Sequence, residues 1–337
     1  MSHRSSGSAA VLASALALAC AAVPVRAATL ATAEASWQAP AGVTLSLGAG
    51  IGVLEGTAFE RSYAPWLREF KLSELKWDLS DVAMAGIEGT ATIGRWVRVG
   101  GTFWAAVSDG DGGMVDRDWL LRDSTADNQW THESRHPDTT VDKGWTGDVD
   151  VDVRAFSAGA LTVRGVLGYR QDVWEWSARG GTFIYTVDAN GDGLIGPDEF
   201  RSRRGSFPAG RLVISYRQEY RVPYLGVVCD GAFGPVQVQG RLLYGPWVSA
   251  EDHDFHALRA TTFDGEFTGG EWLGTGVAGT WHFAPRWYAV AGVEYEKYGE
   301  LTGDVLVRSP EGAALYEDGG GMELETVLVR LGAGFRF

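Results

Sequence analysis

Two short segments of this sequence carry side chains that could together activate a water molecule. Asp116 and Asp118 are separated by one residue, and so are Asp254 and His256. In an extended strand both members of such a pair point to the same face, roughly 6.5–7 Å apart. A carboxylate beside an imidazole orients the ring and stabilises its protonated form, so Asp254 and His256 could act as a general base. Asp116 and Asp118 could hold the water while sharing a proton, because like charges resist joint ionisation.

These residues also have simpler interpretations. Carboxylates in the loops of an acidic chain are often merely solvated, and the spacing alone favours that interpretation. A metal site could instead be formed by Asp252, His253 and His256, which would make the protein a metal-dependent hydrolase. The segment offers no thiolate and no third histidine, so a structural zinc site is not expected there.

The composition predicts a β-protein that does not bind nucleic acid. The chain has 337 residues, and its 29 Lys and Arg stand against 43 Asp and Glu, which gives a formal net charge of −14. Because no arginine-rich stretch offsets this charge, a partner with a phosphate backbone is not expected. Glycine accounts for 46 residues, and Trp, Tyr and Phe for 14, 11 and 14. Glycine weakens helices and aromatic rings favour pleated surfaces, so a helical bundle is disfavoured.

The start of the chain has the features of a secretory signal peptide. A short basic segment precedes an apolar run over residues 9–23, and small residues then suit cleavage before Ala28. The run is too short for a good transmembrane helix. A lipoprotein cleaved before Cys20 is a weaker alternative, because the segment lacks the leucine that such a site prefers. We therefore predict a signal peptide over residues 1–27 and a single mature domain over residues 28–337.

Alternating hydrophobicity predicts strands that line a membrane barrel. Every second residue from Val327 to Phe337 is apolar, and charged or small residues occupy most positions between them. A soluble β-sandwich would also alternate. Aromatic residues at strand ends, a polar second face and a terminal aromatic residue favour a barrel in lipid, which needs aromatic girdles and a polar interior. Polar segments such as residues 108–146 and 186–210 would then be loops at one rim, where binding and chemistry usually lie.

Four segments of the chain resemble the omptin family of outer-membrane proteases. Residues 130–139 read WTHESRHPDT, which is similar to the family signature WTDESRHPDT with His132 in place of Asp. Residues 178–185 (ARGGTFIY) resemble the family segment ARGGSYIY. Residues 113–119 and 247–256 are similar to its acid-pair strand and its Asp/His strand. The similarity runs in order through nearly all of the mature chain.

The resemblance implies an all-β fold: a transmembrane antiparallel β-barrel of ten strands with long extracellular loops. It implies that Asp254 and His256 activate water at the extracellular rim of a Gram-negative-type outer membrane, and that Asp116 and Asp118 face them. Water would then attack a peptide carbonyl directly, without an acyl-enzyme and without a catalytic cofactor. The partners would be outer-membrane lipid and extracellular peptides or proteins with basic residues.

The resemblance also implies a pocket for a basic side chain. Glu60 and Asp252 are similar to the acids of the family's pocket, and Met114 and Ile214 to its apolar walls. Two carboxylates that face a guanidinium form charge-assisted hydrogen bonds, so the cut is expected next to Arg or Lys. The alternative function is a non-catalytic barrel that serves as an adhesin or surface receptor, and the four intact chemical residues argue against it.

One departure from the family concerns lipopolysaccharide. Tyr169 matches a residue of the family's lipopolysaccharide contact, but Gln171, Val173 and Glu219 stand at the positions that are charged there. The usual contact with lipopolysaccharide is therefore in doubt for this chain.

A second departure is an insertion at residues 188–199, DANGDGLIGPDE, which resembles an EF-hand calcium loop. Oxygen donors stand at loop positions 1, 3, 5 and 12 and glycine stands at position 6, as that loop requires. The flanking residues read as strand and loop, not as two helices. An acidic turn rich in Asn and Gly is the alternative, but the full consensus favours calcium in a structural or regulatory role. The expected ligands are Asp188, Asn190, Asp192, Glu199 and the backbone carbonyl of Leu194.

Overall fold

The computed structural model describes residues 42–64, 67–121 and 126–337, so the predicted signal peptide lies outside the described residues. The described part contains fifteen strands and one 3₁₀ helix, η1 (Asp127–Gln129). No described helix is long and apolar enough to cross a membrane. The strands are β1 (Val43–Ala64), β2 (Leu67–Ile93), β3 (Val97–Ala106), β4 (Gly112–Asp118), β5 (His132–Ala158), β6 (Leu161–Arg179), β7 (Thr182–Tyr185), β8 (Arg203–Ser206), β9 (Leu212–Phe233), β10 (Val236–Gly245), β11 (Val248–His256), β12 (Thr261–Gly269), β13 (Trp272–His282), β14 (Trp287–Ser309) and β15 (Gly312–Arg336).

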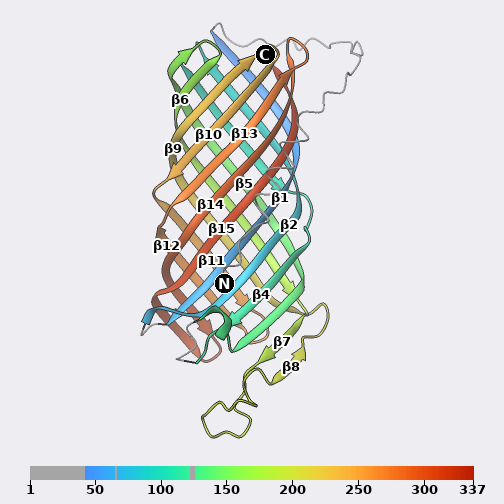
Figure 1. The fold of residues 1–337 in the computed structure, drawn as a ribbon, viewed down its shortest axis with the longest axis vertical. Helices are drawn as coiled ribbons and strands as arrows, with labels where there is room; N and C mark the ends of the chain where they lie inside the picture. Colours follow the sequence, from blue (N-terminus) through green and yellow to red (C-terminus); the bar gives the residue numbers. More distant parts are fainter. Residues whose placement is uncertain (1–41, 65–66, 122–125) are drawn as a thin grey trace. The chain divides into compact units, whose positions relative to one another are not determined.

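The strands form one antiparallel sheet that closes on itself as a barrel (Figure 1). Among the described residues the ring has ten positions, because β3 and β4 share one position, β10 and β11 another, and β12 and β13 a third. β1 pairs with β15 from Ser46–Arg336 to Ser62–Gly320, which closes the ring. Closure removes the strand edges that an open sheet would expose to lipid. The expectation of an antiparallel barrel of ten strands is confirmed.

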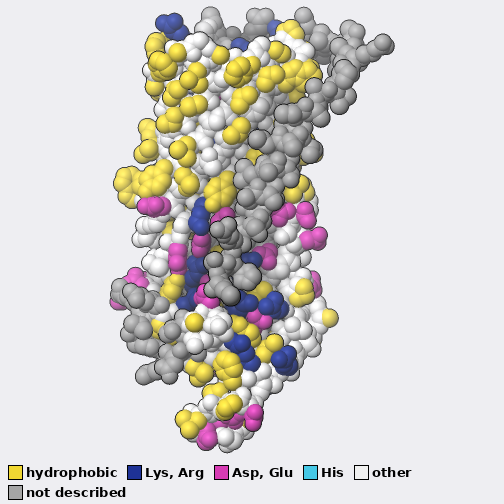
Figure 2. All heavy atoms as spheres, viewed as in Figure 1, with side chains coloured by type: hydrophobic (Ala, Val, Ile, Leu, Met, Phe, Trp, Pro, Cys, Tyr) yellow, Lys and Arg dark blue, Asp and Glu magenta, His cyan; other side chains and the backbone are white. Residues whose placement is uncertain are grey.

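The outer face of one half of the barrel is apolar. Figure 2 shows hydrophobic side chains over the half that contains the C-terminus, whereas charged side chains gather mainly over the other half. Aromatic side chains border this belt at both edges, as a barrel in a lipid bilayer requires. A soluble sandwich would bury such residues, so that alternative is wrong. The exposed belt includes Leu47, Ile51, Ile87, Val149, Leu167, Leu225, Leu242, Val277 and Leu331, bordered by Trp96, Phe156, Phe233, Trp281 and Trp287 at one edge and by Phe103, Tyr169, Tyr244 and Trp247 at the other.

The two rims of the barrel differ in the length of their connections. At the rim that contains the C-terminus, β5 and β6 are joined by two residues, and so are β9 and β10. At the opposite rim, β4 and β5 are separated by residues 119–131, and the β7–β8 hairpin projects beyond the wall (Figure 1). Short turns are typical of the periplasmic side of outer-membrane barrels and long loops of the extracellular side. The rim with the long loops therefore faces the outside of the cell.

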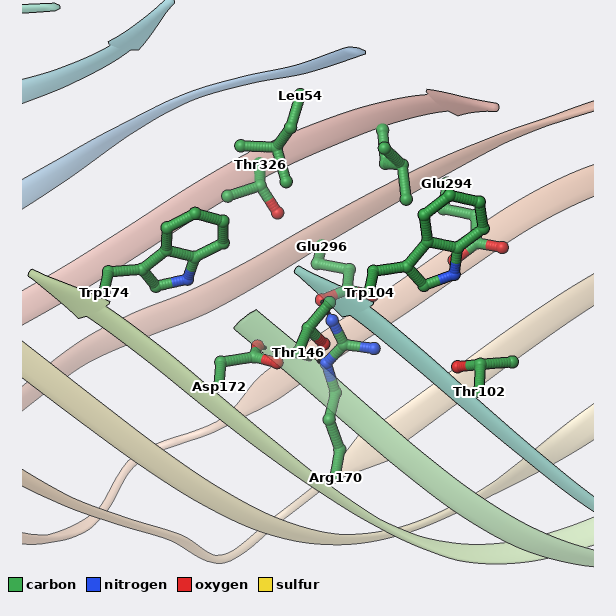
Figure 3. Close-up of a pocket in the computed structure, with 11 residues that line it drawn as sticks. Leu54, Thr102, Trp104, Thr146, Arg170, Asp172, Trp174, Glu294, Glu296 and Thr326 are labelled. Carbon is green, nitrogen blue, oxygen red and sulfur yellow. Dashed lines mark hydrogen bonds and ion pairs between the residues drawn. The ribbon is translucent and has the colours of Figure 1, made fainter. Parts of the chain in front are cut away.

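The interior of the membrane-spanning half is filled by paired charges. Arg330 donates hydrogen bonds to Glu294 and to Glu88, both at 2.9 Å. Figure 3 shows a small cavity there, in which Arg170 points between Asp172 and Glu296. Arg170 lies 3.1 Å from Asp172 and 2.6 Å from Glu296. Because buried ions are tolerated when they are paired, this network fills the membrane-spanning half of the barrel with polar groups.

Aromatic side chains close the barrel just below the extracellular rim. Trp77 of β2, Trp176 of β6 and Tyr216 of β9 are fully buried and lie with ring centroids 5.4–5.9 Å apart. β6 and β9 are neighbours, and Trp176 pairs directly with Tyr216, whereas β2 belongs to another part of the ring, so the contacts of Trp77 join separate parts of the wall. Aromatic contacts of this kind stabilise a core by about 0.5–1.5 kcal/mol per pair beyond the area that they bury. These packed rings support the residues at the extracellular rim from below.

We predict that a charge on the apolar belt destabilises the barrel, whereas the same charge at the extracellular rim does not. Leu331 and Leu315 both lie on β15 and both are 60% exposed, so they form a matched pair. Leu331→Arg should lower the free energy of unfolding by about 2–4 kcal/mol in lipid vesicles, because Leu331 faces hydrocarbon. Leu315→Arg should change it little. Equal effects in denaturant titrations of the two variants would contradict a lipid-facing belt.

Candidate active site

The acid pair, Asp116 and Asp118, lies at the extracellular end of β4. β4 is paired with β2 on one side and with β5 on the other, and it places Asp116 opposite Leu75 and Ser134. Strand alternation points both carboxylates to the inside of the barrel, as the spacing predicted. Ser73 of β2 donates a long hydrogen bond of 3.4 Å to Asp116. The acid pair is therefore held on both sides by regular strand pairing.

The Asp–His pair, Asp254 and His256, lies on β11 between β9 and β12. The Oδ2 atom of Asp254 is 2.6 Å from Nε2 of His256, so the carboxylate orients the ring. Asp254 is 1% exposed, whereas the side chain of His256 retains 15% exposure toward the groove. The imidazole also packs against Phe263, with ring centroids 5.2 Å apart. The i, i+2 spacing thus produces the contact that a general base needs.

The two pairs influence each other across the barrel. Burial, followed by the charge of Asp118, raises the pKa of Asp116 well above its ordinary value, and the charge of Asp254 adds to this rise. Burial also raises the pKa of Asp118, while the charge of His256 opposes the rise. The acid pair therefore retains a proton at pH values where isolated aspartates are fully ionised. The region between the two pairs, which we call the groove, is therefore bordered by two carboxyls of raised pKa and by the Asp–His contact.

The four residues of the predicted pocket come from four strands. Met114 of β4 and Ile214 of β9 are 1% and 2% exposed and form apolar walls. Asp252 of β11 accepts hydrogen bonds from the hydroxyl of Tyr216 at 3.1 Å and from the amide of Gly265 at 2.9 Å. Burial raises the pKa of Asp252 to about 7 despite these bonds. A carboxyl of raised pKa is protonated over a wider pH range than an ordinary aspartate.

Glu60 of β1 joins this pocket to the Asp–His pair. It is buried, and it lies within hydrogen-bonding reach of Asp254. Burial, followed by the charges of Asp254 and Asp252, raises the pKa of Glu60 well above its ordinary value. One oxygen of Glu60 and one of Asp254 are buried without a hydrogen-bond donor among the described residues. Because Glu60 and Asp254 lie within hydrogen-bonding reach of each other, a proton on one carboxyl can satisfy an oxygen of the other.

Sequence reasoning missed two polar residues that support the pocket. Gln218 is 0% exposed and donates hydrogen bonds to the hydroxyl of Tyr216 at 2.9 Å and to the carbonyl of Phe59 at 3.2 Å. Tyr216 in turn binds Asp252. The signal was present, because Ile214, Tyr216 and Gln218 alternate onto one face of β9. A glutamine on the inner face of an otherwise regular strand could have been recognised as a support for the neighbouring acids.

The metal site considered for Asp252, His253 and His256 does not form. His253 points to the outer face of β11, where its Nδ1 atom is 2.6 Å from Asp264. Asp252 and His256 point into the barrel, because alternate residues of a strand face opposite sides. Among the described residues there is no group of three or more His, Cys, Asp or Glu placed to hold a metal ion. The three residues therefore cannot act as a common ligand set.

The inserted segment forms the tip of the β7–β8 hairpin and has no helices beside it. Asp188 accepts hydrogen bonds from the amides of Gly191 at 2.7 Å and of Gly193 at 2.8 Å. Glu199 accepts bonds from the amides of Ala189 and Gly196, both at 2.9 Å. The loop is therefore closed on itself, with the first and last acids turned toward its backbone. Asn190 and Asp192 accept bonds in the same manner, and Leu194 is 72% exposed.

The positions expected to contact lipopolysaccharide lie on the outer face of the barrel. Glu219 accepts hydrogen bonds from Arg217 and Arg221, both at 2.5 Å, and from Gln171 at 2.7 Å. An acid thus occupies the centre of a cationic cluster just beyond the apolar belt. Tyr169 is exposed at the edge of that belt, whereas Val173 is buried. The two arginines are neutralised by the protein itself.

Comparison with known proteins gives a consistent result. The model of the Omptin family matches residues 41–337. The outer membrane protease OmpP of Escherichia coli K12 is 29% identical over 238 residues, which cover 70% of this chain and 71% of that protein. The plasminogen activator of Yersinia pestis is 25% identical and covers 87% of this chain and 90% of its own length.

Solved structures agree on the fold. The crystal structure of the outer membrane protease OmpT of Escherichia coli superposes with a TM-score of 0.80 at 21% identity, over 90% of this chain and 99% of the other. Together with the closed ring and its apolar belt, the family match places the protein in the outer membrane of a Gram-negative bacterium. The chain belongs to the omptin family.

Proposed function

We propose that this protein is an endopeptidase that hydrolyses peptide bonds next to basic residues of extracellular peptides. The observation that carries the proposal is the 2.6 Å contact between Asp254 and His256, which faces an acid pair of raised pKa. The names of the relatives support a protease in general. Asp116 and Asp118 lie at the extracellular end of β4 and His256 at the end of β11, so the substrates would be peptides outside the cell.

The geometry supports a mechanism in which water attacks the peptide carbonyl. Because Asp254 binds Nε2 of His256, the Nδ1 atom takes the proton from the water as its oxygen bonds to the carbonyl carbon. The proton shared by Asp116 and Asp118 hydrogen-bonds to the oxygen that gains negative charge. The imidazolium then gives its proton to the leaving nitrogen as the C–N bond breaks. The products are a carboxylate and an amine, and no acyl-enzyme forms.

The pocket would bind the basic side chain before the cut. A guanidinium or ammonium between Glu60 and Asp252 forms charge-assisted hydrogen bonds with carboxylates that otherwise lack a cation. Each such bond contributes on the order of 1.5–3 kcal/mol in a desolvated site. Met114 and Ile214 would contact the methylene groups of the same side chain. An adhesin or receptor would not need this combination of a buried base, a shared proton and an acidic pocket.

We further propose that the inserted loop binds calcium and that lipopolysaccharide is not required for activity. The loop carries the full set of EF-hand donors, and carboxylate oxygens that accept one amide bond keep a second lone pair for a cation. Glu219 already supplies an anion to Arg217 and Arg221, which removes the reason for these residues to bind a lipid phosphate. The role of calcium would be structural, because the loop lies outside the groove.

His256→Ala should abolish peptide cleavage without unfolding the barrel. The loss of a general base typically lowers kcat by about 10²–10⁴-fold. His253→Ala is the matched control, because His253 lies on the same strand but points to the outer face. The assay is cleavage of a dibasic fluorogenic peptide by the refolded barrel. Turnover near that of the wild type in folded His256→Ala would refute the mechanism. Equal losses of activity in His256→Ala and His253→Ala would show that the effect is not specific to the inward-facing histidine.

Discrimination between arginine and citrulline should increase as pH rises. The pKa of Asp252 is raised to about 7, so this carboxyl gains its charge as pH passes through about 7 and then attracts a cation more strongly. Citrulline has nearly the shape of arginine without its charge, so the comparison isolates the charge of the bound side chain. The ratio of kcat/KM for the two peptides should therefore rise between pH 6 and 8, about tenfold if one charged hydrogen bond of roughly 1.5 kcal/mol is gained.

In a variant with Glu60→Gln and Asp252→Asn the ratio should be low and independent of pH. A high ratio that persists in this variant would exclude both acids from the pocket.

Calorimetry should detect weak calcium binding by the inserted loop. We expect a dissociation constant of about 10⁻⁴–10⁻³ M, because no flanking helices preorganise the ligands. Glu199→Gln should remove this heat, whereas Asp198→Asn, at a neighbouring position outside the donor set, should retain it. Calcium should also slow the cleavage of the loop by an added protease. The absence of calcium heat in the wild type would refute the site.

A further inference from the structure

One arginine ties the base of the inserted hairpin to the segment that precedes β5. The Nε and Nη2 atoms of Arg201 donate hydrogen bonds to the carbonyl of Trp130 at 2.9 and 2.7 Å, and Nη2 also donates to the carbonyl of Asn128 at 2.7 Å. The guanidinium lies over the indole ring of Trp130, 3.4 Å from its centroid. Only arginine has a planar cation that can stack on an aromatic ring and donate several hydrogen bonds at the same time.

The backbone of Arg201 adopts an unusual conformation to make this contact. Its φ is +53°, in the left-handed region that residues other than glycine rarely adopt. The amide of Arg201 donates a hydrogen bond of 3.0 Å to the hydroxyl of Thr186, which lies on the other side of the hairpin. Local strain of this kind persists only where the surrounding contacts determine the conformation, and it is common at functional sites. Arg201 is therefore held in place from its backbone as well as from its side chain.

The contacts continue from Arg201 to the acid pair. The amide and the hydroxyl of Thr186 both donate to the carbonyl of Thr131, at 3.0 and 2.9 Å. Thr131 is 1% exposed, and its own amide and hydroxyl donate to the carbonyl of Asp118 at 2.7 and 3.0 Å. Asp118 is the last residue of β4, so these bonds define where that strand ends. The inserted hairpin is thus connected to the backbone of a residue in the groove.

The other end of this connection is the inserted loop. Glu199 stands two residues before Arg201, and its carboxylate accepts hydrogen bonds from the amides of Ala189 and Gly196. Its carbonyl accepts bonds from the amide of Val187 at 3.3 Å and from the hydroxyl of Ser202 at 2.9 Å. The closed loop therefore fixes the chain direction at Arg201. The loop and the guanidinium of Arg201 are thus linked through two residues of chain.

We propose that Arg201 is a positioning residue that holds Asp118 in place through Trp130 and Thr131. It fastens the inserted hairpin to the segment before β5, and this segment fixes the end of β4 and the direction of the Asp118 side chain. The inference rests on the proposed function, in which Asp118 shares the proton that faces the Asp–His pair. A displacement of about 1 Å in such a group can lower a rate on the order of 10²-fold. In this proposal the inserted hairpin helps to position Asp118 in the groove.

The kinetic test compares Arg201→Ala and Arg201→Lys with Arg204→Ala. Arg204 is exposed on the neighbouring strand β8 and serves as the matched control for the loss of a positive charge. Arg201→Ala should lower kcat at least tenfold and leave KM within twofold, because the pocket for the basic side chain stays intact. Arg201→Lys should recover only part of the rate, since an ammonium group cannot both stack on Trp130 and donate to the two carbonyls in this geometry. Added methylguanidine should partly restore kcat in Arg201→Ala but not in Arg204→Ala.

Hydrogen exchange supplies a measurement that does not depend on activity. The amide of Thr131 bonds to Asp118, so it should exchange at least tenfold faster in Arg201→Ala than in the wild type, while the amides of the apolar belt remain unchanged. An unchanged kcat, or unchanged exchange at Thr131, would overturn the inference. Equal losses of kcat in Arg201→Ala and Arg204→Ala would overturn it as well. If the wild type cleaves no peptide, the proposed function fails, and the exchange at Thr131 still decides whether Arg201 holds this segment.

Discussion

A strand in a membrane must bond all of its backbone groups to neighbouring strands, and this requirement organises the whole molecule. It forces the sheet to close, and closure fixes the register of every strand. Several strands then continue beyond the lipid without losing that register. β1, for example, runs from Val43 near one rim to Ala64 at the other and carries Glu60 close to its outer end. The site therefore lies on strands whose register is already fixed by the membrane-spanning part of the barrel.

The groove concentrates negative charge that the protein does not neutralise itself. In the membrane-spanning half every buried arginine described above has an acidic partner, such as Arg330 between Glu88 and Glu294. In the extracellular half Glu60 and Asp254 are buried beside the half-buried Asp252, and no cation among the described residues pairs with Glu60. Burial of unpaired acids is unfavourable, so proton uptake compensates for it. A substrate with a basic side chain would replace that proton, which couples recognition to the charge state of the site.

The alternation of the strands predicted a barrel, and the resemblance to the family predicted ten strands and the placement of the main site residues. The period of two along a strand predicted that Asp116 and Asp118 share a face, and it also separates His253 from Asp252 and His256. The contacts among strands that are distant in the sequence could not be predicted in the same way. The proximity of Glu60 to Asp254 joins the first strand to the eleventh, and the bond from Thr131 to Asp118 depends on how the intervening loop folds. Motif resemblance identified these segments but not the bonds between them.

The pairing of β1 with β15 has a consequence for the assembly of the barrel. β1 and β15 lie far apart in the sequence, so the ring can close only after both strands have been made. Until then Glu60 cannot complete the pocket, and the walls that carry Asp116 and Asp254 have no fixed distance between them. The proposed site therefore depends on the completed barrel, and a chain in which β1 and β15 have not yet paired would lack it.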